Sequence, residues 1–165
     1  MEGLQLIRAV FDHEPAPRAP WVPFAGAHAG KLIGANARQV LSDEDTLVRA
    51  LLEVNKMYRP DGQPVMFDLQ VEAEILGCGL LWADDAPPSV SSHPLAETTD
   101  IPSKIPGRDE GRLPMALGAM RRMKKEVGGK TALYGLVTGP FTLASHLRGT
   151  EDRKSTRLNS SHRIR

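Results

Sequence analysis

Apolar residues recur at intervals of three and four along several stretches of the chain, a spacing typical of amphipathic helices. The helices that this spacing predicts cover residues 4–11, 47–58, 112–127 and 141–147. Ser42 is the expected N-cap of the second helix, because Asp45 three positions later completes a capping-box arrangement. The four stretches are separated by segments rich in proline and glycine, which indicates that each helix ends before the next element begins.

Runs of consecutive apolar residues between these helices are typical of buried parallel strands. The three main strands predicted in this way are Trp21–Phe24, Val65–Asp68 and Ala132–Val137. A further short strand is expected after Cys78, followed by a long irregular connection over Asp84–Asp109. Connections of that length are usually functional or mobile. Strands that alternate with helices predict an α/β fold with a parallel sheet.

The last residues of the chain change how its charge is interpreted. Asp152–His162 reads DRKSTRLNSSH, which matches in frame, over all eleven residues, the translation of a common sequencing-library adapter. Native sequence is therefore expected to end near Thr150 or Glu151, and residues 152–165 to form a non-native, disordered tail. Without that tail, residues 1–151 carry 16 basic and 19 acidic side chains, a net charge of −3. This balance gives no indication of nucleic-acid binding.

Cysteine content and hydropathy narrow the class of protein further. Cys78 is the single cysteine, so no internal disulfide can form, and this is compatible with a reducing cytoplasm. No run approaches the roughly 18 apolar residues of a membrane span. The first fourteen residues lack the features of a signal peptide. We therefore expect a cytoplasmic protein that does not contact a membrane.

The segment Phe67–Cys78, FDLQVEAEILGC, carries the strongest indication of chemistry. Asp68 ends a predicted strand just before a short amphipathic helix, which is how α/β enzymes present a catalytic acid. From residue type alone, Asp68 could equally be the N-cap of that helix. The spacing of nine between Asp68 and Gly77 resembles the uroporphyrinogen decarboxylase superfamily, and VEAE is similar to its corrinoid-dependent methyltransferases.

This resemblance implies a fold and a chemistry. The fold is the N-terminal part of a (β/α)8 TIM barrel, truncated after about three main parallel strands, with residues 1–151 as a partial domain. A complete barrel needs about 250 residues. Asp68 would be the catalytic residue, stabilising the cationic intermediate formed when a pyrrole acetate is decarboxylated, without a metal or organic cofactor. An Asp68→Asn change is then expected to reduce turnover and to leave folding largely intact.

Other candidate residues would bind a small anionic substrate. Glu72 is one candidate, although an acid in a first helical turn also favours the helix dipole. The loop AGAHAGK resembles the RQAGRYL segment of the decarboxylases, with Ala27 and Lys31 at the two arginine positions and His28 between them. Arginine suits carboxylate binding because its guanidinium can donate two parallel hydrogen bonds. With Ala27 and Lys31 in place of two arginines, one carboxylate contact is lost and the other is weakened. His28 and Lys31 remain able to contact an anion.

The turn Thr138-Gly139-Pro140 follows the third main strand and resembles the family segment GFAGAPFTL. Gly139 and Pro140 would let the backbone approach a ligand closely, and Thr138, Gly139 and Pro140 are therefore expected to contact the substrate. These residues should meet Asp68, His28 and Lys31 at the carboxyl ends of their strands.

Two enzymatic functions remain open at this point. The first is cofactor-independent decarboxylation of a tetrapyrrole-like carboxylated substrate by the full-length protein. The alternative is a corrinoid-dependent methyltransferase, which would use zinc and a corrinoid with ligands in the second half of the barrel. A homodimer or a corrinoid protein is a possible partner of the full-length protein, and the present chain alone is expected to be inactive. The two functions share one fold, and fold alone does not decide chemistry.

Overall fold

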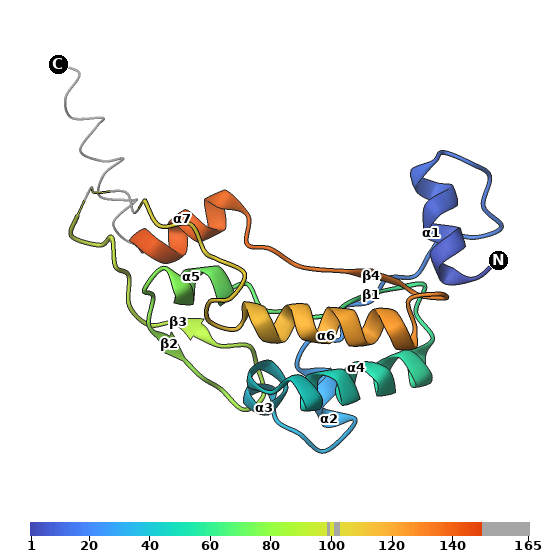
Figure 1. Ribbon diagram of the computed structural model, residues 1–165, viewed down its shortest axis with the longest axis horizontal. Helices are drawn as coiled ribbons and strands as arrows, with labels where there is room; N and C mark the ends of the chain where they lie inside the picture. Colours follow the sequence, from blue (N-terminus) through green and yellow to red (C-terminus); the bar gives the residue numbers. More distant parts are fainter. Residues whose placement is uncertain (99, 101–102, 150–165) are drawn as a thin grey trace.

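A two-stranded parallel sheet joins two distant parts of the chain in the computed structural model, which describes residues 1–98, 100 and 103–149 (Figure 1). Strand β1 (Gly62–Pro64) pairs with β4 (Ala132–Tyr134), with Gly62 opposite Ala132 and Pro64 opposite Tyr134. Parallel neighbours need a crossover connection, and the chain between them supplies it. The predicted α/β architecture, with the second and third main strands parallel, is confirmed.

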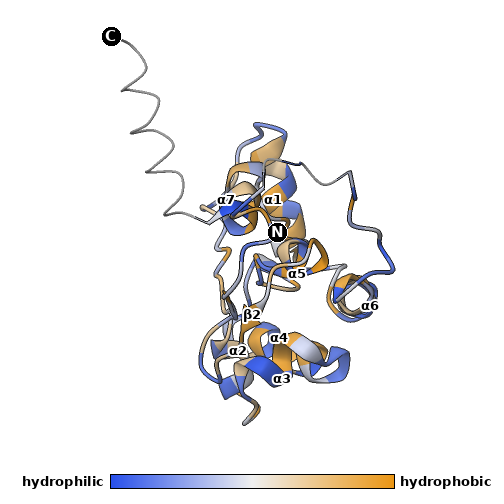
Figure 2. Cartoon of the chain, turned by 90° about the vertical axis from the view of Figure 1, so that its left-hand side faces the viewer, coloured by the Kyte–Doolittle hydropathy of each residue, from blue (hydrophilic) through white to orange (hydrophobic). Residues whose placement is uncertain are grey.

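Seven helices and a small hairpin accompany this sheet in the described residues. The helices are α1 (Gly3–Phe11), α2 (His28–Lys31), α3 (Ala37–Ser42), α4 (Glu44–Tyr58), α5 (Val71–Ile75), α6 (Leu113–Glu126) and α7 (Pro140–Arg148). Strands β2 (Leu80–Leu81) and β3 (Ser89–Val90) form an antiparallel pair. Figures 1 and 2 show α2, α3 and α4 grouped together, with α5 and α7 apart from them. No helix in the described ranges has the length and apolar character needed to cross a bilayer.

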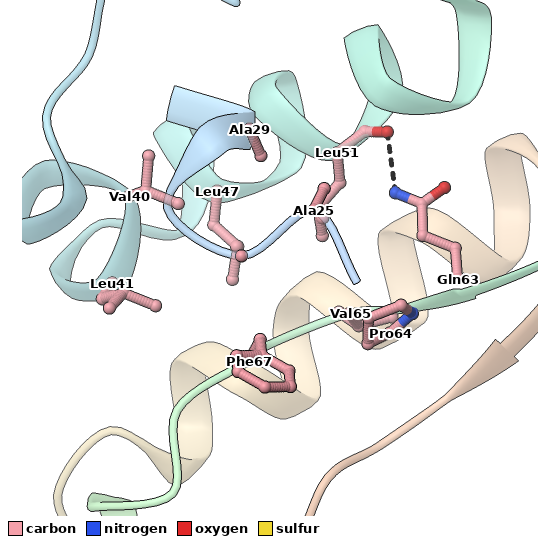
Figure 3. Close-up of a pocket in the computed structure, with 11 residues that line it drawn as sticks. Ala25, Ala29, Val40, Leu41, Leu47, Leu51, Gln63, Pro64, Val65 and Phe67 are labelled. Carbon is pink, nitrogen blue, oxygen red and sulfur yellow. Dashed lines mark hydrogen bonds between the residues drawn. The ribbon is translucent and has the colours of Figure 1, made fainter. Parts of the chain in front are cut away.

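The main core forms where α4 packs against α6 and the sheet. Leu47, Val54 and Met123 are at most 2% exposed, and each such side chain stabilises the fold by about 2 kcal/mol through burial. Gln63 of β1 is also buried, and its side-chain amide donates to the Leu51 carbonyl of α4 at 2.9 Å (Figure 3). Strand β1 is therefore fixed to α4 by a satisfied polar contact within an otherwise apolar layer.

Some predicted boundaries are wrong, for identifiable physical reasons. Ser42 is the last residue of α3, and the N-cap of α4 is Asp43, whose carboxylate accepts from the Thr46 amide at 2.8 Å. Trp21–Phe24 does not form a strand, because Pro23 within it and Pro20 just before it lack the amide hydrogens that a ladder needs.

The other strand predictions need smaller corrections. The second main strand lies at Gly62–Pro64, three residues before the predicted Val65–Asp68, although the Val65 amide still donates to the Tyr134 carbonyl at 3.1 Å. The third ends at Tyr134, before the predicted end at Val137. The short strand after Cys78 exists as β2, in a hairpin. The predicted tail at residues 152–165 lies outside the described residues.

A buried carboxylate ties the segment before α2 to the start of β1. Asp61 is 5% exposed and accepts from both terminal nitrogens of Arg18, at 2.6 and 2.7 Å, and from the Trp21 amide at 2.7 Å. The hydrogen bonds from Arg18 hold the pKa of the Asp61 carboxyl below its ordinary value of 3.8, despite the opposing effect of burial. This geometry replaces the strand pairing that the sequence predicted for Trp21.

The lowered pKa of Asp61 predicts a loss of stability in acid. Because the folded state binds the proton of Asp61 less tightly than the unfolded state, the stabilisation is complete above the unfolded pKa of 3.8 and decreases as pH falls below it. We expect Asp61→Asn to remove this component, so that the unfolding free energy falls less steeply below about pH 4. Urea denaturation at a series of pH values measures this, with Asp85→Asn as an exposed control. An unchanged acid slope in Asp61→Asn would contradict the assignment.

Candidate carboxylate site at the strand ends

Asp68 lies beyond the carboxyl end of β1 and is held on both sides. Its side chain is completely buried, at 0% exposure. One carboxylate oxygen accepts from the Gln70 amide at 2.8 Å, and the other forms an ion pair with Arg112 Nη1. Gln70 is the N-cap residue of α5. Asp68 is therefore not the N-cap of α5, although its carboxylate accepts from the amide of the N-cap residue; it lies just beyond the strand end, and its catalytic role stays a prediction.

Arg112 precedes the first residue of α6 and joins several elements at this point. In addition to the ion pair with Asp68, Arg112 forms two further hydrogen bonds. Its Nε donates to Glu74 of α5 at 2.8 Å, and its Nη1 donates to the Leu41 carbonyl of α3 at 3.2 Å. The guanidinium carbon lies 4.9 Å from the centre of the Trp82 ring, a cation–π contact. The side chain is 11% exposed. Arg112 could not be identified as a site residue from the sequence, because no local pattern connects it with a carboxylate 44 residues away.

Glu72 and Thr138 form a second polar contact at the same end of the sheet. The Thr138 amide donates to Glu72 Oε1 at 3.2 Å, and the Thr138 hydroxyl lies 2.8 Å from Glu72 Oε2. The same hydroxyl lies 2.6 Å from the Leu69 carbonyl. Helix α5 is therefore bound on one side to the segment after β4 and on the other to Arg112.

A cavity of about 170 Å³ lies between the strand ends and α6. Asp68 and Glu72 are its charged lining residues, and both are acidic. The rest of its lining is apolar and comes from the segments after β1 and β4, from α5 and from α6. The structure thus brings three predicted site residues, Asp68, Glu72 and Thr138, to one place: the first two line the cavity and the third bonds to Glu72.

Gly139 and Pro140 continue directly from Thr138 into α7. Gly139 is the N-cap residue with φ of −60°, and Pro140 is the first helical residue, a favourable position for proline. A Cβ added to Gly139 would meet no atom within 4 Å. The described chain itself therefore gives no steric reason for a glycine there.

His28 and Lys31 lie elsewhere. His28 Nε2 hydrogen-bonds to the Tyr58 hydroxyl at the end of α4, at 2.8 Å, and Lys31 is exposed on the surface of α2. Neither lines the cavity beside Asp68, and both figures place α2 with α3 and α4, away from α7. The structure does not bring these two residues together with the carboxylates.

The described residues do not offer a metal site. Across the described ranges, no group of three or more His, Cys, Asp and Glu side chains is arranged to hold a metal ion. Cys78 is buried, its thiol lies 3.4 Å from the His146 carbonyl, and burial raises its pKa. The described residues therefore do not fit zinc.

The family described as uroporphyrinogen decarboxylase (URO-D) matches residues 3–161. Among individual relatives, the methylated-thiol–coenzyme M methyltransferase of Methanosarcina mazei is 36% identical over 88 residues, covering 52% of this chain and 23% of that protein. The methylcobamide:CoM methyltransferase MtbA of Methanosarcina acetivorans is 35% identical over 88 residues, covering 52% and 26%. The uroporphyrinogen decarboxylase of Nostoc punctiforme is 28% identical over 102 residues, covering 62% and 29%.

A solved structure, a methyltransferase from Methanosarcina mazei, superposes with a TM-score of 0.81 at 20% identity. The superposition covers 98% of this chain and 50% of that one. The present chain thus spans about a quarter of the curated relatives and half of the solved structure. The fold agrees with the predicted part of a barrel, and the match over residues 3–161 shows that the chain belongs to the uroporphyrinogen decarboxylase (URO-D) family.

Proposed function

We propose that this chain is part of a methyltransferase of the URO-D family that transfers a methyl group to a thiol. The observation that carries the proposal is the charge of the cavity at the strand ends. Its charged lining residues are Asp68 and Glu72, and the other lining residues are apolar. Asp68 is paired with Arg112, so within the described residues Glu72 is the lining carboxylate without a cationic partner. A lining with Glu72 and no basic side chain is unfavourable for a substrate with many carboxylates, whereas an apolar wall suits a methyl-bearing group.

The α2 region supports the same choice. The decarboxylases resembled by this loop carry two arginines there, and this chain has Ala27 and Lys31 instead. His28 is bonded to Tyr58, so its ring nitrogen is not free to take over the carboxylate binding of either arginine. Over the aligned segments, the two methyltransferase relatives are 36% and 35% identical across 88 residues, and the Nostoc punctiforme decarboxylase is 28% identical across 102 residues.

The proposal also includes a methyl donor, a metal and partner proteins for the full-length protein. The names of the two methyltransferases include a methylated thiol and a methylcobamide. We infer that a corrinoid carries the methyl group here, presented by a separate corrinoid protein, and that any zinc ligands come from sequence beyond the described residues. A homodimer of the full-length protein is a further proposal that oligomer measurements would test.

Decarboxylation remains the second candidate. Asp68 keeps the family spacing to Gly77, and Asp68 lies at a strand end as a catalytic acid would. In that case Asp68 would stabilise positive charge on a tetrapyrrole-like substrate, and Lys31 would bind one of its carboxylates. Arg112 is the obstacle, since it already occupies one oxygen of Asp68 in the structure.

Two assays on the full-length gene product separate these functions. We expect transfer of methyl from methylcobalamin to a small thiol such as coenzyme M, and no loss of carboxyl groups from uroporphyrinogen. Lys31→Ala should leave methyl transfer unchanged, because Lys31 lies outside the cavity. Decarboxylation that is weakened by Lys31→Ala, without any methyl transfer, would overturn the proposal. The 165-residue chain should be inactive in both assays.

A further inference from the structure

Helix α5 carries Glu72, but five residues are too few for a helix to be stable without tertiary contacts. Its position must therefore be set by contacts with neighbouring elements. On one side, Glu72 reaches Thr138. On the other, both Glu74 within the helix and Asp68 just before it bind Arg112. One guanidinium thus holds the helix and the residue that leads into it.

We propose that Arg112 is a positioning residue of the candidate site, which fixes α5 so that Glu72 meets Thr138 and lines the strand-end cavity. The proposal rests on the proposed function. Arg112 touches neither Glu72 nor the Thr138 hydroxyl, and it is not a lining residue of the cavity. It acts through Asp68 and Glu74.

The contacts of Arg112 require an arginine. Nε and Nη1 bind separate carboxylates on different elements, while the guanidinium carbon lies over the Trp82 ring. A lysine ammonium is a single point charge on a flexible stem, so it cannot keep two carboxylates and an aromatic face in fixed relation. Arg112→Lys would preserve the charge and lose the geometry.

Arg122, which lies within α6, provides a matched control. It also pairs with two carboxylates, Glu44 at 3.2 Å and Asp45 at 2.6 Å, but its side chain is 43% exposed and these carboxylates lie at the start of α4. Exchange of arginine for lysine there should change little, because exposed ion pairs contribute weakly.

Steady-state kinetics of the full-length protein test the proposal. We expect Arg112→Lys to lower kcat by about tenfold or more, because small displacements of site groups slow chemistry strongly, with KM within about twofold. Arg122→Lys should keep kcat. In a Glu72→Gln background, Arg112→Lys should have little further effect, since it acts through the position of Glu72. Full kcat in Arg112→Lys, or full additivity with Glu72→Gln, would overturn the proposal.

Two further measurements keep the proposal falsifiable. If Arg112→Lys does not fold, Glu74→Ala removes only the contact between Arg112 and α5, and it should still lower kcat by several-fold. If the wild type transfers no methyl group, the proposed function is wrong. Hydrogen exchange then tests separately whether Arg112 holds α5 in place. The Glu74 and Leu76 amides should exchange faster in Arg112→Lys than in Arg122→Lys, and equal exchange would contradict positioning.

Discussion

Replacing Asp68 by alanine is expected to lower the unfolding free energy by about 3 kcal/mol, because it leaves Arg112 buried with an incomplete set of partners. The Asp68 side chain is 0% exposed and that of Arg112 is 11% exposed, so water cannot readily take the place of the lost carboxylate. Glu74 would still bind Nε, which keeps the loss below that of a completely unpaired charge. A loss of this size lowers the melting temperature by roughly 10 °C.

Asp45→Ala is the matched control for this experiment. Asp45 also binds an arginine of α6, Arg122, at 2.6 Å, but its side chain is 79% exposed. Pairs of that kind contribute about 0–1 kcal/mol. Thermal and urea denaturation of both variants should therefore separate them clearly. Equal and small losses would mean that the Asp68–Arg112 pair contributes no more than a surface contact.

The ion pair between Asp68 and Arg112 also changes the expected effect of Asp68→Asn. From the sequence, that change should reduce turnover and spare the fold, because asparagine has the shape of aspartate. With Arg112 bound to one oxygen, the substitution also weakens a buried ion pair, so a loss of activity alone would not identify Asp68 as catalytic. Activity must be compared with stability in the same variant, and Glu72→Gln supplies the comparison.

Features that depend on local sequence pattern could be predicted, namely the helices and the parallel arrangement of the strands. The helices at 4–11 and 112–127 correspond to α1 and α6, and the apolar runs led to the parallel pairing of β1 and β4. Strand boundaries were less accurate, because Gly62 and Gln63 lack the apolar character used to find strands. Their place in the sheet is fixed by distant partners, such as the Leu51 carbonyl for Gln63.

In the candidate site, too, some residues could be predicted from local sequence pattern and others depend on distant partners. Asp68, Glu72 and Thr138 each follow a predicted strand or begin a helix, and the shared edge of parallel strands brings them together. His28 also follows an expected strand at Trp21–Phe24, but that strand does not form, so its place relative to Asp68 could not be predicted. The role of Arg112 could not be predicted from local pattern, because its partners lie on α3, α5 and the segment after β1, which come together only in the folded protein.

Gly3→Ala is expected to destabilise the protein by about 2 kcal/mol, although alanine is the better helix former. A Cβ at Gly3 would lie 2.5 Å from the Asp61 Cα and 2.7 Å from the Asp61 carbonyl oxygen. These are backbone atoms at the start of β1, and Asp61 is itself held by Arg18 and Trp21, so neither side can move easily. The first turn of α1, whose Leu4 amide donates to the Lys130 carbonyl at 2.7 Å, would have to shift.

Gly129→Ala tests the same substitution without the close contact. A Cβ at Gly129 would meet no atom within 4 Å, and its backbone conformation is open to other residues. Alanine there should be neutral or stabilising by up to about 1 kcal/mol, because it restricts the unfolded chain. Opposite signs for the two variants in urea denaturation would show that the approach of α1 to Asp61 controls the position of the first helix. If Gly3→Ala were as stable as Gly129→Ala, α1 would have to be free to move away from β1, and the apolar groove of about 330 Å³ between α1 and β4 would not have a fixed shape.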